Sequence, residues 1–122
     1  MNNFIHVALY IKSCDPENGD MSVAFIPKGN ELILPCQKLA TLRSKETAVM
    51  LCQKYISASM SWYNILPLCF YDIDASIYLV YQINIPNNTM SIMKNGAKLY
   101  NYEQIKENIA RIDKASSFIL SS

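Results

Sequence analysis

Residues 31–59 read ELILPCQKLATLRSKETAVMLCQKYISAS, and this stretch decides the fold that we expect. Its apolar start predicts a strand over 31–34 that ends at Pro35, and a loop over 36–43 follows. Apolar residues then recur at intervals of three and four, which predicts a helix over about 45–59. Ser44 suits the N-cap, and Glu46 lies in the first turn, where a carboxylate meets the helix dipole favourably.

Two further strands are predicted upstream of this stretch. Residues 21–26 form one of them, which stops at Pro27, and the turn Lys28-Gly29-Asn30 joins it to 31–34 as a hairpin. Residues 4–12 form the other, because apolar side chains alternate along it. One face carries Ile5, Val7, Leu9 and Ile11, and the opposite face carries Phe4, His6, Ala8, Tyr10 and Lys12.

Downstream of the helix the sequence predicts a long hairpin, formed by residues 63–71 and 76–85 and turning through 72–75. Pro67 lies inside its first strand, which therefore lies at a sheet edge or carries a bulge. A shorter pair of strands, over 90–93 and 98–100, is predicted around the turn dipeptide Asn95-Gly96.

The last segment predicts a helix over 102–119. Asn101 suits the N-cap and Gln104 follows three residues later, as in a capping box. The resulting element order predicts an α+β fold of the α/β/α sandwich type, with a mixed sheet flanked by helices near 45–59 and 102–119, in a single domain over 1–122. The apolar stripe of the second helix comprises Tyr102, Ile105, Ile109, Ile112, Ser116 and Ile119.

Composition excludes several classes of protein. Of 122 residues, 51% are hydrophobic and 17% charged, which is the opposite of the signature of disorder. Eleven basic and ten acidic residues give a net charge of +1, which argues against a dedicated binder of duplex nucleic acid. The sequence shows neither a signal peptide nor an apolar run of roughly 20 residues. We therefore expect a cytoplasmic protein without membrane contact.

The cysteines indicate neither a zinc site nor a disulfide framework, because no pair forms a CxxC motif and the chain has one histidine. We expect reduced thiols, mostly buried, and no cofactor. The bias toward Ile, Asn, Tyr and Lys, whose codons are AT-rich, indicates a low-GC bacterium or a phage that infects one. The cysteines are Cys14, Cys36, Cys52 and Cys69.

The arrangement of these elements resembles that of Nudix domains. Segments 7–11, 22–26 and 32–39 follow one another as do the first strand, the hairpin and the Leu-Pro turn of that family, and the helix over 45–59 falls where the Nudix helix would lie. The resemblance implies an α/β/α sandwich. For members with the full signature, it also implies a hydrolase activity that depends on divalent cations bound by the glutamates of the signature.

The sequence departs from the Nudix signature at the metal ligands. Laid on Leu34-Pro35 without gaps, the signature places Gln37 at its glycine and Arg43 at its first glutamate. Magnesium needs hard oxygen ligands, and no Asp or Glu occurs between Glu46 and Asp72. We therefore expect a module without Nudix hydrolase activity. The Arg-Glu and Glu-Glu pairs are replaced by Leu51, Cys52, Tyr55 and Ile56.

Two sets of residues are candidates for ligand binding. Lys38, Arg43, Ser44 and Lys45 precede or open the helix, and such a basic segment at a helix N-terminus suits a metal-free anion site, with a solvated basic loop as the alternative. Tyr71 and Tyr78, among several aromatic residues, could stack on a nucleobase, pack within the sheet or meet a partner. The other aromatic residues of that set are Trp62, Tyr63, Tyr81, Tyr100 and Tyr102.

These features predict a binding or regulatory module that recognises a protein partner, such as a host enzyme, or a nucleotide-like anionic ligand. Its size and composition suit an accessory protein of a phage or mobile element. The alternative is a hydrolase of nucleoside-diphosphate-type substrates whose metal is held by Glu46, Asp72 or Asp74. A homodimer formed through the sheet or a helix is a third possibility.

Overall fold

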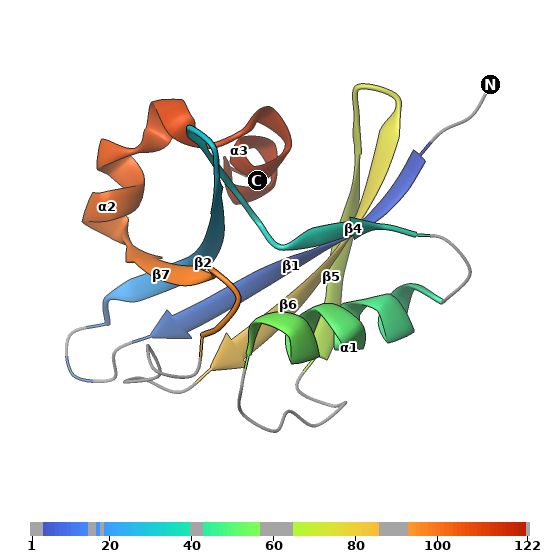
Figure 1. The fold of residues 1–122 in the computed structure, drawn as a ribbon, viewed down its shortest axis with the longest axis horizontal. Helices are drawn as coiled ribbons and strands as arrows, with labels where there is room; N and C mark the ends of the chain where they lie inside the picture. The colour runs from blue at the N-terminus through green and yellow to red at the C-terminus, as the bar shows by residue number, and fades with distance from the viewer. Residues whose placement is uncertain are drawn as a thin grey trace.

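A computed structural model describes residues 4–14, 17, 19–39, 43–56, 65–85 and 93–121. No helix in these ranges is long and apolar enough to cross a membrane. The elements, drawn in Figure 1, are β1 (Phe4–Cys14), β2 (Met21–Lys28), β3 (Glu31–Ile33), β4 (Cys36–Lys38), α1 (Ser44–Tyr55), β5 (Ile65–Ile73), β6 (Ser76–Ile85), β7 (Lys98–Asn101), α2 (Tyr102–Glu107), a 3-10 turn η3 (Ile109–Arg111) and α3 (Lys114–Ser121).

Strand β1 lies at the centre of a mixed sheet whose order is β3-β2-β1-β6-β5. It pairs in parallel with β6 along ten residues, whereas its other long edge is shared by β4 and β2, both antiparallel. Strand β7 extends the sheet by pairing with β2. The mixed sheet confirms the predicted α+β class.

The sheet is covered on both faces, with α1 on one side and α2 and α3 on the other (Figure 1). Val7, Leu9 and Ile11 of β1 are fully buried against α1, and Ala8 packs into the cluster on the α3 side. Successive side chains of a strand point to opposite faces, so β1 carries apolar residues on both. The two faces predicted for residues 4–12 are confirmed.

Two of the predicted hairpins, β2–β3 and β5–β6, are present. Strands β2 and β3 pair antiparallel, with Lys28 opposite Glu31, and Pro27 lies within β2 instead of ending it. Strands β5 and β6 pair antiparallel, β5 is an outer strand, and a bulge occurs at Pro67, so both consequences predicted for that proline are confirmed. Asn95 and Gly96 adopt the positive φ angles of a tight turn.

The predicted continuous helix over 102–119 is wrong. The capping box of Asn101 and Gln104 is present, but α2 ends at Glu107, and η3 and α3 follow as separate elements. The break arises because Ile112 leaves the helical path to form a parallel bridge with Leu32. In the first half of the predicted stripe Tyr102 and Ile109 are exposed and Ile105 is half-buried, whereas Ile112, Ser116 and Ile119 of the second half are buried.

Three boundaries also differ from the prediction. The loop over 36–43 contains β4, which pairs with β1. Helix α1 begins at Ser44 with Arg43 as its N-cap, and it ends at Tyr55 because Ile56 turns into a bridge with Met93. Strand β7 pairs with β2, whereas the segment 90–92, predicted as its partner, lies outside the described residues, as do 57–59 of the predicted helix.

Candidate functional site

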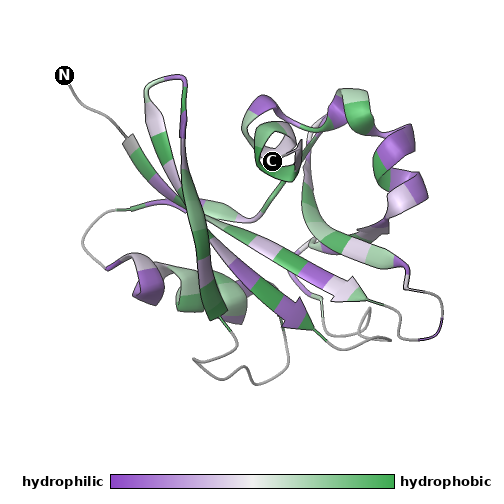
Figure 2. Cartoon of the chain, turned by 180° about the vertical axis from the view of Figure 1, so that it is seen from behind, coloured by the Kyte–Doolittle hydropathy of each residue, from purple (hydrophilic) through white to green (hydrophobic). Residues whose placement is uncertain are grey.

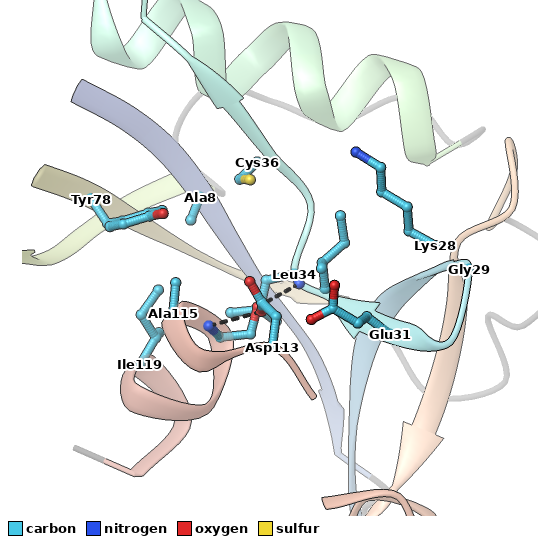
Figure 3. A pocket seen from close by; sticks show the side chains of 12 residues that line it. Ala8, Lys28, Gly29, Glu31, Leu34, Cys36, Tyr78, Asp113, Ala115 and Ile119 are labelled. Atoms are coloured by element: carbon cyan, nitrogen blue, oxygen red, sulfur yellow. Dashed lines mark hydrogen bonds between the residues drawn. The ribbon is translucent and has the colours of Figure 1, made fainter. Parts of the chain in front are cut away.

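A cavity of about 480 Å³ opens between the sheet, the β2–β3 hairpin and α3 (Figure 3). We call it the α3 pocket. Ala8, Cys36 and Tyr78 line it from the sheet. Lys28, Gly29, Glu31, Ile33 and Leu34 line it from the hairpin and the residue after it, and Asp113, Ala115, Ser116 and Ile119 line it from α3 and the residue before it. Its volume lies in the usual range for small-molecule sites.

A chain of hydrogen bonds fixes the start of α3 against this hairpin. The Leu34 N–H donates to Ser116 Oγ at 2.9 Å, and the Ser116 N–H donates to Asp113 Oδ1 at 3.1 Å (Figure 3). Asp113 thus serves as the N-cap of α3, and its own N–H donates to the carbonyl oxygen of Leu32 at 3.1 Å. This chain holds the Asp113 carboxylate at the pocket wall, with Oδ2 available as a second acceptor.

The polar groups of the pocket influence one another. The surrounding pocket walls desolvate the Cys36 thiol and raise its pKa although the residue is exposed, the Asp113 carboxylate raises it further, and the Lys28 ammonium opposes that shift. Burial also raises the pKa of the Tyr78 hydroxyl, with smaller contributions from Cys36, Asp113 and Asp74. Both groups therefore stay protonated at neutral pH, so the Tyr78 hydroxyl is available as a donor.

Tyr78 is held by an aromatic neighbour. Its ring stacks on His6, with centroids 4.9 Å apart and planes inclined by 15°. Burial and the charge of Lys38 lower the pKa of His6, so this histidine is neutral at pH 7. His6 lies opposite both Lys38 and Tyr78 in the sheet, and residues directly opposite share a face. Lys38 therefore lies on the pocket face of the sheet.

Of the six predicted ligand-binding residues, Lys38, Tyr71 and Tyr78 are brought to this same face. Tyr71 pairs with Tyr78 across β5 and β6, and its ring contacts Phe118 of α3 edge to face at 5.5 Å between centroids. Near the hairpin turn, Lys114 Nζ and Asp74 Oδ2 lie 2.8 Å apart. These two contacts pack the β5–β6 hairpin against α3 beside the pocket.

The remaining three residues lie at the start of α1, on the opposite face of the sheet. Ser44 Oγ shares a hydrogen bond of 2.7 Å with the Tyr81 hydroxyl, Arg43 is exposed, and Lys45 is half-buried. The Arg43 carbonyl oxygen accepts hydrogen bonds from the Thr47 N–H and the Thr47 hydroxyl, as is usual in the first turn of a helix. The two predicted sets therefore do not form one site. Residues 40–42 of the basic segment lie outside the described part of the chain.

Of the twelve residues that line the pocket, only Tyr78 was predicted from the sequence, and Lys28, Cys36 and Asp113 are among those that were not. Asp113 lies off the apolar stripe of the helix predicted over 102–119, although an aspartate is also a typical N-cap residue. Cys36 was placed in a loop. Cys36 and Lys38 lie two residues apart, and such a spacing puts both side chains on one face only if 36–38 form a strand. The expectation that most thiols are buried is wrong, because Cys14, Cys36 and Cys69 are exposed.

Helix α1 carries one acid, Glu46, which is exposed in its first turn. Leu51, Cys52 and Tyr55, onto which the signature places its catalytic pairs, are buried in the core. Among the residues that the structure describes, no group of three or more His, Cys, Asp or Glu side chains could hold a metal ion. These positions of α1 therefore serve packing.

No protein-family model and no curated protein sequence matches the chain. Among solved structures, a mutT/nudix family protein from Listeria innocua matches at 10% identity with a TM-score of 0.76, over 99% of this chain and 91% of that chain. The fold is Nudix-like. The C-terminal domain of mouse MUTYH, solved in complex with human PCNA, matches at 12% identity with a TM-score of 0.78, over 98% of this chain and 86% of that chain.

A MutT/nudix family protein from Enterococcus faecalis also matches, at 14% identity and a TM-score of 0.64, over 83% of this chain. This chain spans 44% of that protein's length, so the likeness covers less than half of the larger protein. At these identities the comparisons establish the fold alone.

Proposed function

We propose that the chain is a binding module that holds a nucleotide-like ligand in the α3 pocket without hydrolysing it. The observation that carries this proposal is the convergence of Tyr78, Asp113 and Lys28 on one cavity of about 480 Å³. Such a cavity combines apolar walls with a few placed polar groups, which is the usual composition of a small-molecule site.

The polar groups of the pocket complement different parts of a nucleotide. A nucleobase edge carries N–H donors beside acceptor atoms, and it would meet the Asp113 carboxylate as acceptor and the Tyr78 hydroxyl as donor. The Lys28 ammonium on the β2–β3 hairpin would contact a phosphate, and Lys38 on the same face of the sheet adds a second cation. The base would therefore enter first, with the phosphates toward the lysines.

The absence of hydrolysis is proposed from α1. By its position in the chain, α1 resembles the helix on which the Nudix family holds its metal-binding glutamates, and the chain has no acid from Thr47 to Tyr71. Leucine, cysteine and tyrosine offer almost no hard oxygen to Mg²⁺, so the metal-assisted attack of water lacks its ligands. We accordingly propose that the module has lost the Nudix box glutamates.

Calorimetry with ADP, GDP, CDP and UDP tests this function. We expect at least one of them to bind equally well in Mg²⁺ and in EDTA, without release of phosphate. Asp113→Asn keeps a good N-cap but removes the charge, and should weaken binding at least about tenfold. Glu107→Gln, at an exposed acid of α2 outside the lining, is the matched control. Absence of binding by all four nucleotides would refute the proposal.

The hydrolase alternative predicts the opposite dependence on metal. If Glu46, Asp72 or Asp74 held a catalytic cation, phosphate would be released in Mg²⁺ but not in EDTA, and Asp72→Asn or Asp74→Asn would slow that release. In the structure Asp74 instead lies in the hairpin turn beside Lys114. We therefore favour binding without turnover.

A protein partner is the second candidate function, and it is supported by the likeness to the MUTYH domain, which was solved in complex with PCNA. We extend this candidate to an accessory role in the cytoplasm of a host cell, with a host enzyme as the partner, because the small size and the bias toward Ile, Asn, Tyr and Lys suit a phage or mobile element. Pull-down from a low-GC host with wild-type chain tests it. A partner that is captured reproducibly and also binds as a purified protein would support this role.

A further inference from the structure

Strand β5 presents an apolar outer edge. Within the described residues it pairs with β6 alone, and no described strand pairs with its other edge. Leu66, Leu68 and Phe70 are 53%, 46% and 70% exposed, which is unusual for large apolar side chains gathered on one strand. Figure 2 shows this strand hydrophobic along most of its length at the border of the sheet.

Outer strands are normally protected against pairing, by charges above all. From Ile65 to Tyr71 the strand carries no charged residue, and Asp72 stands at its end. Pro67 removes one backbone donor, and the bulge between Pro67 and Cys69 also protects the edge, but no charge does so from Ile65 to Tyr71. The sequence of β5 is therefore typical of a strand that is covered, not of one that faces water.

A shallow groove of about 250 Å³ runs beside this edge, on the face of the sheet that carries α1. Pro67, Leu68 and Phe70 line it from β5, and Leu79 and Tyr81 line it from β6. Ser44, at the start of α1, closes one side and bonds to the Tyr81 hydroxyl. The groove thus offers apolar walls directly beside the exposed Phe70 ring.

We propose that a second copy of this chain covers the β5 edge, with the two β5 strands antiparallel about a twofold axis near Leu68. Such an axis makes the contact self-complementary, so that each Phe70 lies toward the groove of the other copy. The open backbone groups of the two edges would pair with each other. No like charges meet at the centre of this contact, because Ile65–Tyr71 is uncharged.

The exposed area suits a dimer of moderate strength. Large apolar side chains carry roughly 150–250 Å² each, so Leu66, Leu68 and Phe70 leave about 300 Å² of apolar surface on each copy. The two copies together supply about 600 Å², more than half of the roughly 1,000 Å² that a specific interface needs. The exposed Pro67 and Cys69, together with the strand backbone, add to that area.

Sedimentation velocity of the purified chain over a range of concentrations tests the dimer. We expect the wild type to approach twice the monomer mass of 13.9 kDa at high concentration. Phe70→Lys and Leu68→Lys place like charges about the axis and should raise the dissociation constant at least about tenfold. Ile109→Lys is the matched control, because Ile109 is 57% exposed on η3, away from β5, and this variant should dimerise like the wild type.

Two results would overturn the proposal: a wild type that stays monomeric at every concentration, or a Phe70→Lys variant that dimerises as tightly as the wild type. Leu68 and Phe70 are both exposed, so their substitution leaves the core unchanged, and circular dichroism verifies the fold of each variant. Phe70→Leu should retain dimerisation, because it keeps an apolar side chain at the edge. The dimer is independent of the α3 pocket, so nucleotide binding and association can fail separately.

Discussion

Replacement of Ser116 by alanine should destabilise the protein through one hydrogen bond. Ser116 is 4% exposed, and its Oγ accepts the buried Leu34 N–H at 2.9 Å. Removal of the hydroxyl leaves that N–H buried without this acceptor, which costs about 1–3 kcal/mol. Alanine is the better helix former by about 0.5 kcal/mol, so we expect a net loss of about 1–2 kcal/mol.

Urea denaturation and thermal unfolding measure this loss. For a domain of this size a change of 1 kcal/mol lowers the melting temperature by about 4 °C, so Ser116→Ala should melt about 4–8 °C lower. Ser117→Ala, the next residue of α3, gains the same helix propensity without losing the bond to Leu34 and serves as the control. If Ser116→Ala is no less stable than Ser117→Ala, the bond does not hold α3 to the hairpin and our account of the pocket wall is wrong.

The remaining predictions concern two thiols. Burial raises the pKa of Cys52 from 9.0 to about 12, so unfolding releases a proton as the pH rises above 9, and the free energy of unfolding should fall from there toward pH 12. Cys52→Ala should flatten that slope in urea titrations, and an unchanged slope would contradict it. Cys36, whose pKa is also raised, should react slowly with iodoacetamide at pH 8, and Asp113→Asn should accelerate its alkylation because one cause of that shift is lost. Mass spectrometry measures the alkylation rate of Cys36 in the wild type and in Asp113→Asn. Cys69 is the internal reference, because Asp113→Asn should leave its alkylation rate unchanged.

Much of the fold is encoded locally and was therefore predictable. The alternation in β1 identifies a strand buried on both faces, because a period of two is the signature of pleated backbone. Pro67 predicted an outer strand or a bulge through its missing N–H, and the structure has both. Asn101 and Gln104 predicted the start of α2, since a capping box depends on four successive residues.

The errors arise where a distant segment decides the local structure. Ile112 continues a helical period in sequence, yet its bridge to Leu32 ends that helix. Residues 36–38 carry little strand propensity, and they form β4 because β1 offers an open edge. Asp113 reached the pocket through the same break in the helix. The aromatic half of the candidate site was thus visible in the sequence, whereas its acidic half depends on contacts between β3 and α3.

The parallel pairing of β1 with β6 sets the order in which the molecule can assemble. Phe4 pairs with Ser76 and Ser13 with Ile85, so more than half of the chain must be synthesised before the central ladder can close. The hairpins β2–β3 and β5–β6 rely on neighbouring residues and can form earlier. Until β6 arrives, the edge of β1 that pairs with it has no hydrogen-bonding partner from this strand during translation. Loop-closure entropy therefore makes the docking of β1 on the β5–β6 hairpin the natural slow step of folding.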